Sequence, residues 1–276
     1  MSELSSEFQA HKDQTGVRHR YKKDLRRVME HFCEDFGNRL AAGIDSAEVT
    51  RWLEGRSTQW EKMNHRRILS VFFSYAKGIG ATPSNPFDNV PKPRLPVTRC
   101  EIFTVAETRK LLLGTLEYEP LLVPWLAIGL FAGLRSAELD RLSWGDITDT
   151  VIRIEPQTAK TASRRVVDLS PNLIAWLLPY KKANGPLLPP DCRRMRERLC
   201  QAVRVSWKSN GMRHSFASYH LAMHQDSPRT ALALGHSNPA LVFRHYREMV
   251  SQKQAYEYFG LIPPTKEESG KLVAFT

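Results

Sequence analysis

Five side chains from position 135 onward have the chemistry to attack a phosphodiester. In chain order they are Arg135, Lys160, Arg213, His236 and Tyr246. A tyrosine hydroxyl can act as a covalent nucleophile once its proton is removed. A guanidinium can bind two oxygens of one phosphate, and two guanidinium groups would neutralise the charge that develops in the transition state. This set could break a phosphodiester without a metal ion.

Each member of the set also has an ordinary structural interpretation when it is taken alone. Arg135 stands three residues before Glu138 and could form a simple salt bridge with it. Lys160 lies in an expected loop, where most lysines are merely solvated. His236 follows a glycine at an expected helix end, where histidines often cap or pack. The chemical interpretation therefore depends on elements that would bring the five side chains together.

The first block of the chain, residues 1–90, has the periodicity of a helical domain. Apolar residues recur at helical spacing from Val17 to Phe36, and a shorter helix is expected from Asp45 to Leu53. Thr58 begins a capping-box pattern that should open another helix, which ends at Gly78. Residues 91–100 are basic and rich in proline, which predicts an extended linker and a domain boundary.

The second block, residues 101–250, predicts a mainly helical domain with a small antiparallel sheet. Thr104 begins another capping box, and residues 120–134 are apolar on all sides, as in a central core helix. Residues 151–154 and 165–169 have the pattern of two strands, and the loop between them carries Lys160. Further helices are expected at 170–180, 191–203, 212–223 and 230–234. The segment 251–276 is polar and should end in a loose tail.

The charge balance favours a polyanionic partner. Forty Lys and Arg against 29 Asp and Glu leave a net charge of +11, which is compatible with nucleic acid or an acidic membrane surface. The longest uncharged run, residues 120–134, is too short to span a bilayer. The first residues lack the basic and apolar regions of a secretory signal. We therefore expect a cytoplasmic protein with no membrane partner.

Neither the cysteines nor the histidines form a convincing metal site. His220 and His224 stand four residues apart on an expected helix, but the intervening residues include no glutamate, so they do not match the zinc protease pattern. The cysteine spacings match neither a zinc site nor a redox pair; these residues are Cys33, Cys100, Cys192 and Cys200. We predict free thiols, no metal and no cofactor.

Four ordered motifs resemble the boxes of the tyrosine recombinase (phage integrase) family. Gly-Leu-Arg-Ser-Ala-Glu-Leu at 133–139 resembles the first arginine box, and Thr-Ala-Lys-Thr at 158–161 resembles the lysine hairpin. Met-Arg-His-Ser-Phe-Ala at 212–217 resembles the second arginine box, and residues 234–246 resemble the histidine and tyrosine boxes. The match covers most of residues 100–250. Any one box is weak evidence, whereas four in this order are specific.

The resemblance implies a fold and an assembly. It implies a two-domain C-shaped clamp on double-stranded DNA, with residues 1–90 as the helical core-binding domain and 101–250 as the catalytic domain. Residues 251–276 would dock on a neighbouring subunit or pack back onto their own domain. The active assembly would be a homotetramer on a specific DNA site, and the protein would be a monomer or weak oligomer when free. It would be a nucleoid-associated protein of a mobile element.

The resemblance also implies a site-specific recombinase or integrase reaction that needs neither metal nor ATP. Tyr246 would attack DNA to leave a 3′-phosphotyrosine and a free 5′-hydroxyl. Arg135, Arg213 and His236 would bind the phosphate, Lys160 would protonate the leaving oxygen, and Glu138 would orient the arginines. Contacts to the DNA backbone would come from basic residues, which could also be a solvated face: Arg18, Lys22, Arg66, Arg67, Lys92, Arg94, Arg99, Arg164 and Arg165.

One position departs from the family pattern. Asn210 stands three residues before Arg213, where the family usually has histidine or lysine. His214 does not replace it, because a histidine directly after the arginine is common in the family and is expected to pack inside. An asparagine amide can donate a hydrogen bond to a phosphate but cannot carry a proton. Activity would survive if this position only holds the phosphate, and would be crippled if it must carry a proton.

Three other functions remain open. A type IB topoisomerase shares the chemistry but religates the same strand. A catalytically weakened DNA-binding protein is suggested by Asn210. A basic protein for RNA or membranes would leave the four ordered motifs unexplained.

Overall fold

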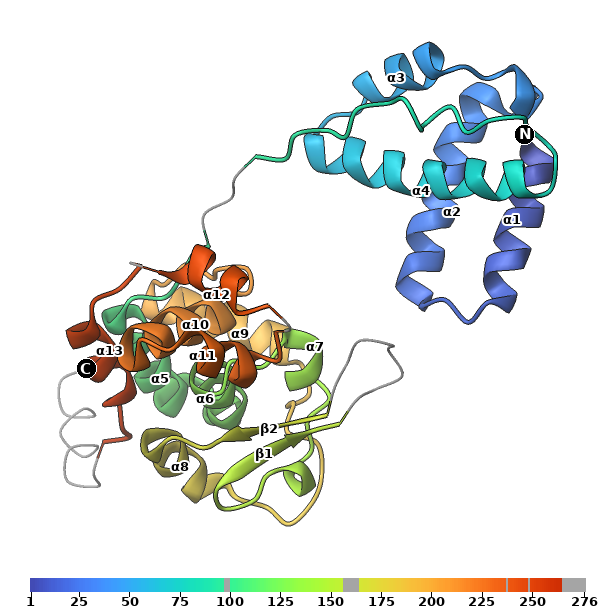
Figure 1. Ribbon diagram of the computed structural model, residues 1–276. Helices are drawn as coiled ribbons and strands as arrows, with labels where there is room; N and C mark the ends of the chain where they lie inside the picture. The colour runs from blue at the N-terminus through green and yellow to red at the C-terminus, as the bar shows by residue number, and fades with distance from the viewer. Residues whose placement is uncertain (97–99, 156–163, 237, 248, 265–276) are drawn as a thin grey trace. The chain divides into compact units, whose positions relative to one another are not determined.

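The computed structural model describes the chain except residues 97–99, 156–163, 237, 248 and 265–276 (Figure 1). The chain divides into two compact units, Met1–Thr98 and Arg99–Thr276. We refer to them as the N-terminal and C-terminal units and describe each by itself. Lys160 and Arg99, both predicted site residues, lie outside the described residues. The assignment of the units as core-binding and catalytic domains stays a prediction.

The N-terminal unit is helical. Its helices are α1 (Ser2–Gln14), α2 (His19–Phe36), α3 (Ser46–Glu54) and α4 (Gln59–Gly78). Two helix starts are capped by side chains: the Asp45 side chain accepts from the Glu48 amide at 2.8 Å, and the Thr58 hydroxyl, the cap expected from the sequence, accepts from the Glu61 amide at 3.0 Å. These two short polar side chains satisfy amides that a helix start leaves without partners.

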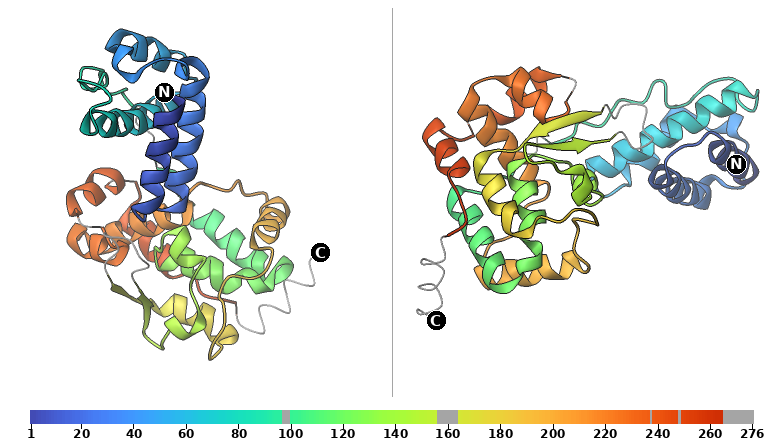
Figure 2. Two further views of the ribbon diagram at one scale, coloured as in Figure 1. Left: turned by 90° about the vertical axis from the view of Figure 1, so that its right-hand side faces the viewer. Right: turned by 90° about the horizontal axis from the view of Figure 1, so that it is seen from below.

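Helix α1 was not predicted from the sequence. Only Ser5 and Phe8 of this helix are buried, so it carries little apolar periodicity. Phe8 is fully buried, and its ring lies 5.4 Å from Phe72 and 5.2 Å from Tyr75 of α4. Helices α1 and α2 run side by side in the two further views (Figure 2). Tertiary contacts, among them those of Phe8, therefore hold a helix that its local sequence does not predict.

The described part of the C-terminal unit is mainly helical with a small two-stranded antiparallel sheet, as predicted. Strands β1 (Val151–Ile154) and β2 (Arg165–Asp168) pair so that Ile152 faces Val167. The helices are α5 (Val105–Tyr118), α6 (Val123–Phe131), α7 (Ser136–Leu139), α8 (Pro171–Leu177), α9 (Cys192–Val203), α10 (Gly211–His224), α11 (Ser227–Leu234), α12 (Pro239–Tyr246) and α13 (Gln252–Phe259).

Helix α6 forms the centre of the C-terminal core. All its residues are buried, and it packs against α5, α8 and α10. The sequence predicted one helix over residues 120–134, whereas the structure has a 3₁₀ turn at Pro120–Leu122 and then α6. Pro124 fits the first turn of α6, where a missing amide hydrogen costs nothing. The chain then turns at Gly133, which has a φ of +64°.

Helix α13 packs onto its own unit. The Tyr258 ring is fully buried and stacks on Tyr219 at 4.0 Å between centroids, and its hydroxyl donates to the Leu130 carbonyl of α6 at 2.7 Å. Of the two alternatives that the sequence left open for this segment, the structure adopts packing on its own unit for residues 252–261. Among the described helices, none is both long enough and apolar enough to cross a bilayer.

Candidate active site

The turn between α6 and α7 projects the first arginine. Only glycine fits at position 133, because a Cβ there would lie 2.2 Å from the Phe216 ring. Arg135 is the N-cap of α7, and its Nη1 donates to Glu138 Oε1 at 2.8 Å. Its Nη2 donates to the Gly235 carbonyl at 2.8 Å, across 100 positions of sequence. The salt bridge with Glu138 therefore exists, and the same guanidinium also reaches the turn before His236.

Arg213 joins the same two turns from the start of α10. Its Nη1 donates to the Gly133 carbonyl at 2.6 Å, and its Nη2 donates to the Leu234 carbonyl at 2.8 Å. The residue is only 9% exposed. Burial, reinforced by the positive charge of Arg135, lowers the pKa of Arg213 to about 10. The guanidinium therefore stays charged at neutral pH, in a setting that favours an added anion.

Arg165 belongs to this cluster, which differs from its predicted role as a DNA-backbone contact. Its side chain is 6% exposed and binds Glu138 through two hydrogen bonds, of 2.9 and 2.7 Å. Strand alternation explains the difference, because Arg165 shares the inward face of β2 with Val167. Gly235 leaves room for it, since a Cβ there would lie 2.9 Å from Arg165 Cδ.

Glu138 is held as a carboxylate by these partners. Burial raises its pKa, but the hydrogen bonds from the Arg165 guanidinium and the Arg135 amide outweigh burial and hold the pKa at about 2. One carboxylate therefore orients two arginines from separate segments of the chain. This arrangement agrees with the orienting role predicted for Glu138, which itself stays a prediction.

His236 follows the turn that the arginines clamp. Gly235 ends α11 with a φ of +64°, and the His236 amide donates to the Ala231 carbonyl at 2.8 Å. Burial, together with the charges of Arg213, Arg135 and Arg165, lowers the pKa of His236 to about 4. Its Nδ1 is buried and has no hydrogen-bond partner among the described residues. The imidazole is thus neutral at pH 7 and carries an unused polar atom beside three cations.

Tyr246 is the last residue of α12 and is 6% exposed. Its hydroxyl lies 2.8 Å from Nδ1 of His214 on α10. Burial, aided by the Cys100 side chain and opposed by the charge of Arg213, raises the pKa of Tyr246 to about 12. The phenol is therefore protonated at neutral pH and needs a proton acceptor before it can attack.

His214 is the residue of the site that the sequence did not assign. It was expected only to pack inside, because its type and position are common beside the second arginine. Its contact with Tyr246 spans 32 positions and depends on how α10 and α12 pack, so no local pattern indicates it. The order of the two boxes was the single available hint.

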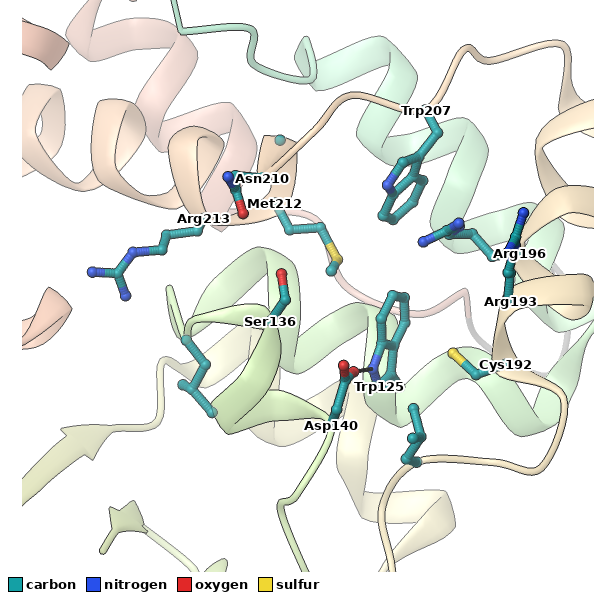
Figure 3. Close-up of a pocket in the computed structure, with 13 residues that line it drawn as sticks. Trp125, Ser136, Asp140, Cys192, Arg193, Arg196, Trp207, Asn210, Met212 and Arg213 are labelled. Atoms are coloured by element: carbon teal, nitrogen blue, oxygen red, sulfur yellow. Dashed lines mark hydrogen bonds between the residues drawn. The ribbon is translucent and has the colours of Figure 1, made fainter. Parts of the chain in front are cut away.

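Asn210 lies at the start of α10 beside a cavity of about 260 Å³. It adopts a left-handed backbone with a φ of +53° and is exposed. The cavity is lined by Asn210, Ser136, Trp125 and Trp207 among others, and the Arg213 guanidinium extends away from the two tryptophans (Figure 3). Asn210 is therefore exposed at the edge of this cavity, and the Arg213 guanidinium points away from it.

The remaining predicted backbone contacts divide into two groups. Arg66 is half-buried, and its guanidinium donates to the carbonyls of Val90 and Phe87, which ties α4 to the following segment. Three others are exposed or partly exposed and already have a partner, namely Lys22 with Asp13, Arg67 with Asn64, and Arg164 with Glu155. Arg18, Lys92 and Arg94 are exposed. Contact of any of them with DNA stays a prediction.

The other titratable groups have structural roles. His220 Nδ1 lies 2.8 Å from the Thr230 hydroxyl, which fits the structural role predicted for the His220–His224 pair. All four cysteines are free. In the described parts of the chain, no three His, Cys, Asp or Glu side chains lie close enough together to hold a metal ion.

The fold of this chain is similar to the folds of solved integrase structures. No family model matches the chain, and no curated protein matches it in sequence. A lambda integrase dimer bound to a COC′ core site is similar at a TM-score of 0.73 and 14% identity, covering 91% of this chain and 97% of that one. The Tn1549 transposon integrase in complex with circular intermediate DNA has a TM-score of 0.70 and 18% identity, covering 90% and 95%.

A third solved structure extends the comparison to a larger assembly. It is a lambda integrase tetramer bound to a Holliday junction, with a TM-score of 0.69 and 14% identity, covering 95% of this chain and 79% of that one. At these identities the likeness establishes the fold. The resemblance to tyrosine recombinases, predicted from four motifs, is thereby confirmed at the level of the fold.

Proposed function

We propose that this chain is a site-specific DNA recombinase or integrase that cuts and rejoins DNA through a 3′-phosphotyrosine, without a metal ion or ATP. One observation carries the proposal. Arg135 and Arg213 come from two separate boxes, and they bind the consecutive carbonyls of Gly235 and Leu234 at 2.8 Å each. That turn leads directly into His236 and then into α12, whose last residue is Tyr246. The four described members of the set, Arg135, Arg213, His236 and Tyr246, are thus joined through this turn and the helix that follows it.

The cluster is suited to hold a phosphate. Arg135 has a side chain 45% exposed, so part of its planar fork faces outward beside the buried Arg213. Glu138 neutralises part of the arginine charge and fixes the guanidinium groups of Arg135 and Arg165 by hydrogen bonds. One well-placed arginine is worth about 10³ to 10⁵ in rate in other phosphoryl transfers. Two arginines with a neutral His236 as a further donor can therefore stabilise the transition state.

The reaction follows from the roles of these groups. The Tyr246 oxygen forms a bond to phosphorus as the bond to the 5′ oxygen breaks, and Lys160 supplies the proton to that leaving oxygen. The 3′-phosphotyrosine stores the bond energy, so a 5′-hydroxyl from a second duplex can reverse the step without ATP. Asn210 would donate its amide hydrogen to a phosphate oxygen in place of a proton-carrying residue.

The proposed partner is double-stranded DNA, on which four copies of this chain would assemble as a homotetramer. The net charge of +11 favours a polyanion. Two of the similar structures are described as an integrase dimer and an integrase tetramer bound to DNA. The exposed side chains of Arg18, Lys92 and Arg94 fit contacts to phosphates. The N-terminal unit would then serve as the core-binding domain.

The test is capture of the covalent complex. Nicked duplexes tiled across the DNA on either side of the gene are incubated with the protein and resolved on a denaturing gel. We expect a protein–DNA adduct that Tyr246→Phe abolishes. Tyr256→Phe is the matched control, because Tyr256 is 57% exposed on α13 and should keep the adduct. An absence of adduct with wild type on every duplex, or an adduct with Tyr246→Phe, would refute the proposal. Holliday-junction products would distinguish recombination from strand relaxation.

A further inference from the structure

The Tyr246 hydroxyl is in contact with a side chain of the second arginine box to which the sequence assigned no chemical role. Nδ1 of His214 lies 2.8 Å from the Tyr246 oxygen, and the two ring centroids are 5.8 Å apart. Among the described residues, His214 provides the observed hydrogen bond of this hydroxyl. The contact is built by two helices, because α10 carries His214 and α12 carries Tyr246 and the two pack together.

The protonation states of the pair set the direction of the hydrogen bond. Burial and the nearby charges of Arg213 and His245 lower the pKa of His214 below its usual value, so the imidazole is neutral at pH 7. The phenol, with a pKa of about 12, keeps its proton. The hydroxyl therefore donates and Nδ1 accepts, which assigns the imidazole proton to Nε2.

An acceptor is needed because unassisted ionisation is rare. With a pKa of about 12, roughly one Tyr246 in 10⁵ would be ionised at pH 7. Bulk water reaches the group poorly, since the residue is 6% exposed. The other titratable groups that face the pair are Cys100, Arg213 and His245. Arg213 is a cation, and burial raises the pKa of the Cys100 thiol, so that it keeps its proton. The His245 ring centroid lies 6.4 Å from that of Tyr246, whereas His214 Nδ1 is within hydrogen-bond distance of the hydroxyl.

We propose that His214 is the proton acceptor for the nucleophile Tyr246. This inference rests on the proposed recombinase function and adds a residue to it. As the Tyr246 oxygen bonds to phosphorus, its proton moves to His214 Nδ1 and the 5′ oxygen leaves with a proton from the general acid. In the return step the His214 imidazolium gives the proton back to the tyrosine oxygen as the phosphotyrosine bond breaks. Charge and protons balance in both directions.

The test compares adduct formation by wild type and His214→Asn on a nicked duplex that wild type cleaves. Asparagine keeps a hydrogen-bonding atom near Nδ1 but cannot take the proton. We expect single-turnover cleavage at pH 7 to fall by about 10² to 10⁴, the usual worth of general acid–base catalysis, while affinity for the duplex is unchanged. His245→Gln is the matched control on α12 and should cleave at the wild-type rate.

The pH profile separates a proton acceptor from a merely structural contact. The wild-type rate should rise through the lowered pKa of His214 and then level off, because only the neutral imidazole accepts. The His214→Asn rate should keep rising by about tenfold per pH unit toward the pKa of the phenol. Wild-type rate and profile in His214→Asn would overturn the proposal, and so would faster cleavage, which would make the contact a restraint on the tyrosine.

A DNA-free measurement keeps the inference separate from the proposed function. Nitrogen-15 chemical shifts of His214 are compared between wild type and Tyr246→Phe. We expect Nδ1 to be unprotonated at pH 7 in wild type and its shift to move when the hydroxyl is removed. A protonated Nδ1 at pH 7 would refute the inference. Absence of a wild-type adduct would instead refute the recombinase function.

Discussion

Replacing Glu138 by glutamine is expected to destabilise the C-terminal unit by roughly 3 kcal/mol at pH 7. The carboxylate is 20% exposed and receives two bonds from Arg165 and one from the Arg135 side chain. Its pKa falls from 4.5 to about 2, a difference of about 2.5, and each pKa unit is worth about 1.36 kcal/mol. Removing one partner of a buried pair typically costs about 3–5 kcal/mol, which agrees in size.

The sign of the pH dependence follows from the lowered pKa. The contribution of Glu138 is complete above pH 4.5, where the unfolded carboxyl is already ionised, and it is lost as the pH falls from 4.5 toward 2. The difference in unfolding free energy between wild type and Glu138→Gln should therefore be constant from neutral pH down to about 5. Below that it should shrink as the wild-type carboxylate takes up its proton.

Urea titrations read by hydrogen exchange measure this difference for one unit at a time. Peptides that cover residues 123–139 and 211–224 report on the C-terminal unit. Glu197→Gln is the control: Glu197 pairs with Arg193 on the surface of α9, with 51% and 84% of their side chains exposed, and should cost no more than about 0.5 kcal/mol. An effect of Glu138→Gln equal to that of Glu197→Gln, or a difference that grows below pH 4.5, would refute the reasoning.

Three further predictions follow from the site and from the N-terminal unit. Gly235→Ala should lower the unfolding free energy by about 1–3 kcal/mol, because its φ of +64° disfavours a side chain and a Cβ would lie 2.9 Å from Arg165; Gly43→Ala, where a Cβ meets nothing within 4 Å, is the control in thermal unfolding. Asn210→His should cleave DNA at a rate within about threefold of wild type. Asn210→Ala should cleave about tenfold more slowly, because it loses a hydrogen bond to a charged phosphate. A cleavage rate raised by about 10² or more in Asn210→His would mean that this position must carry a proton. Arg18→Ala should reduce the slope of log affinity for DNA against log salt concentration by about one counterion. Arg66→Ala should leave that slope unchanged and lower the unfolding free energy of the N-terminal unit, because the Arg66 guanidinium binds main-chain carbonyls. Equal slopes for both variants would contradict the assignment.

Local patterns predicted the capped starts of α4 and α5 correctly. Thr58 and Thr104 were identified as caps from the residues that follow them, and both hydroxyls accept the expected amides. Capping depends on four consecutive residues, so the sequence contains all the information that it needs. The strands 151–154 and 165–168 were located for the same reason, since alternation is a property of neighbouring residues.

The intramolecular partners of two predicted DNA contacts could not be predicted from the sequence. Arg165 was predicted to contact DNA from the hairpin, and in the structure it is buried and binds Glu138, 27 positions earlier in the chain. Arg66 was also predicted to contact DNA, and the carbonyl of Val90 accepts its hydrogen bond. A charged side chain on an element has the same appearance in sequence whether it faces solvent or a buried acceptor. Only the packing of the elements distinguishes the two.

The sequence by itself determined which chemical groups are present and in what order, and these were sufficient to predict the fold and a phosphodiester chemistry centred on Tyr246. The tertiary structure decided what surrounds that tyrosine. It buries the phenol, raises its pKa to about 12 and places His214 at 2.8 Å as its hydrogen-bond partner. The physical reason is that the pKa of a phenol depends on desolvation and on charges within a few ångströms. Those neighbours come from α10, from α12 and from the segment before α5, which only the folded chain brings together.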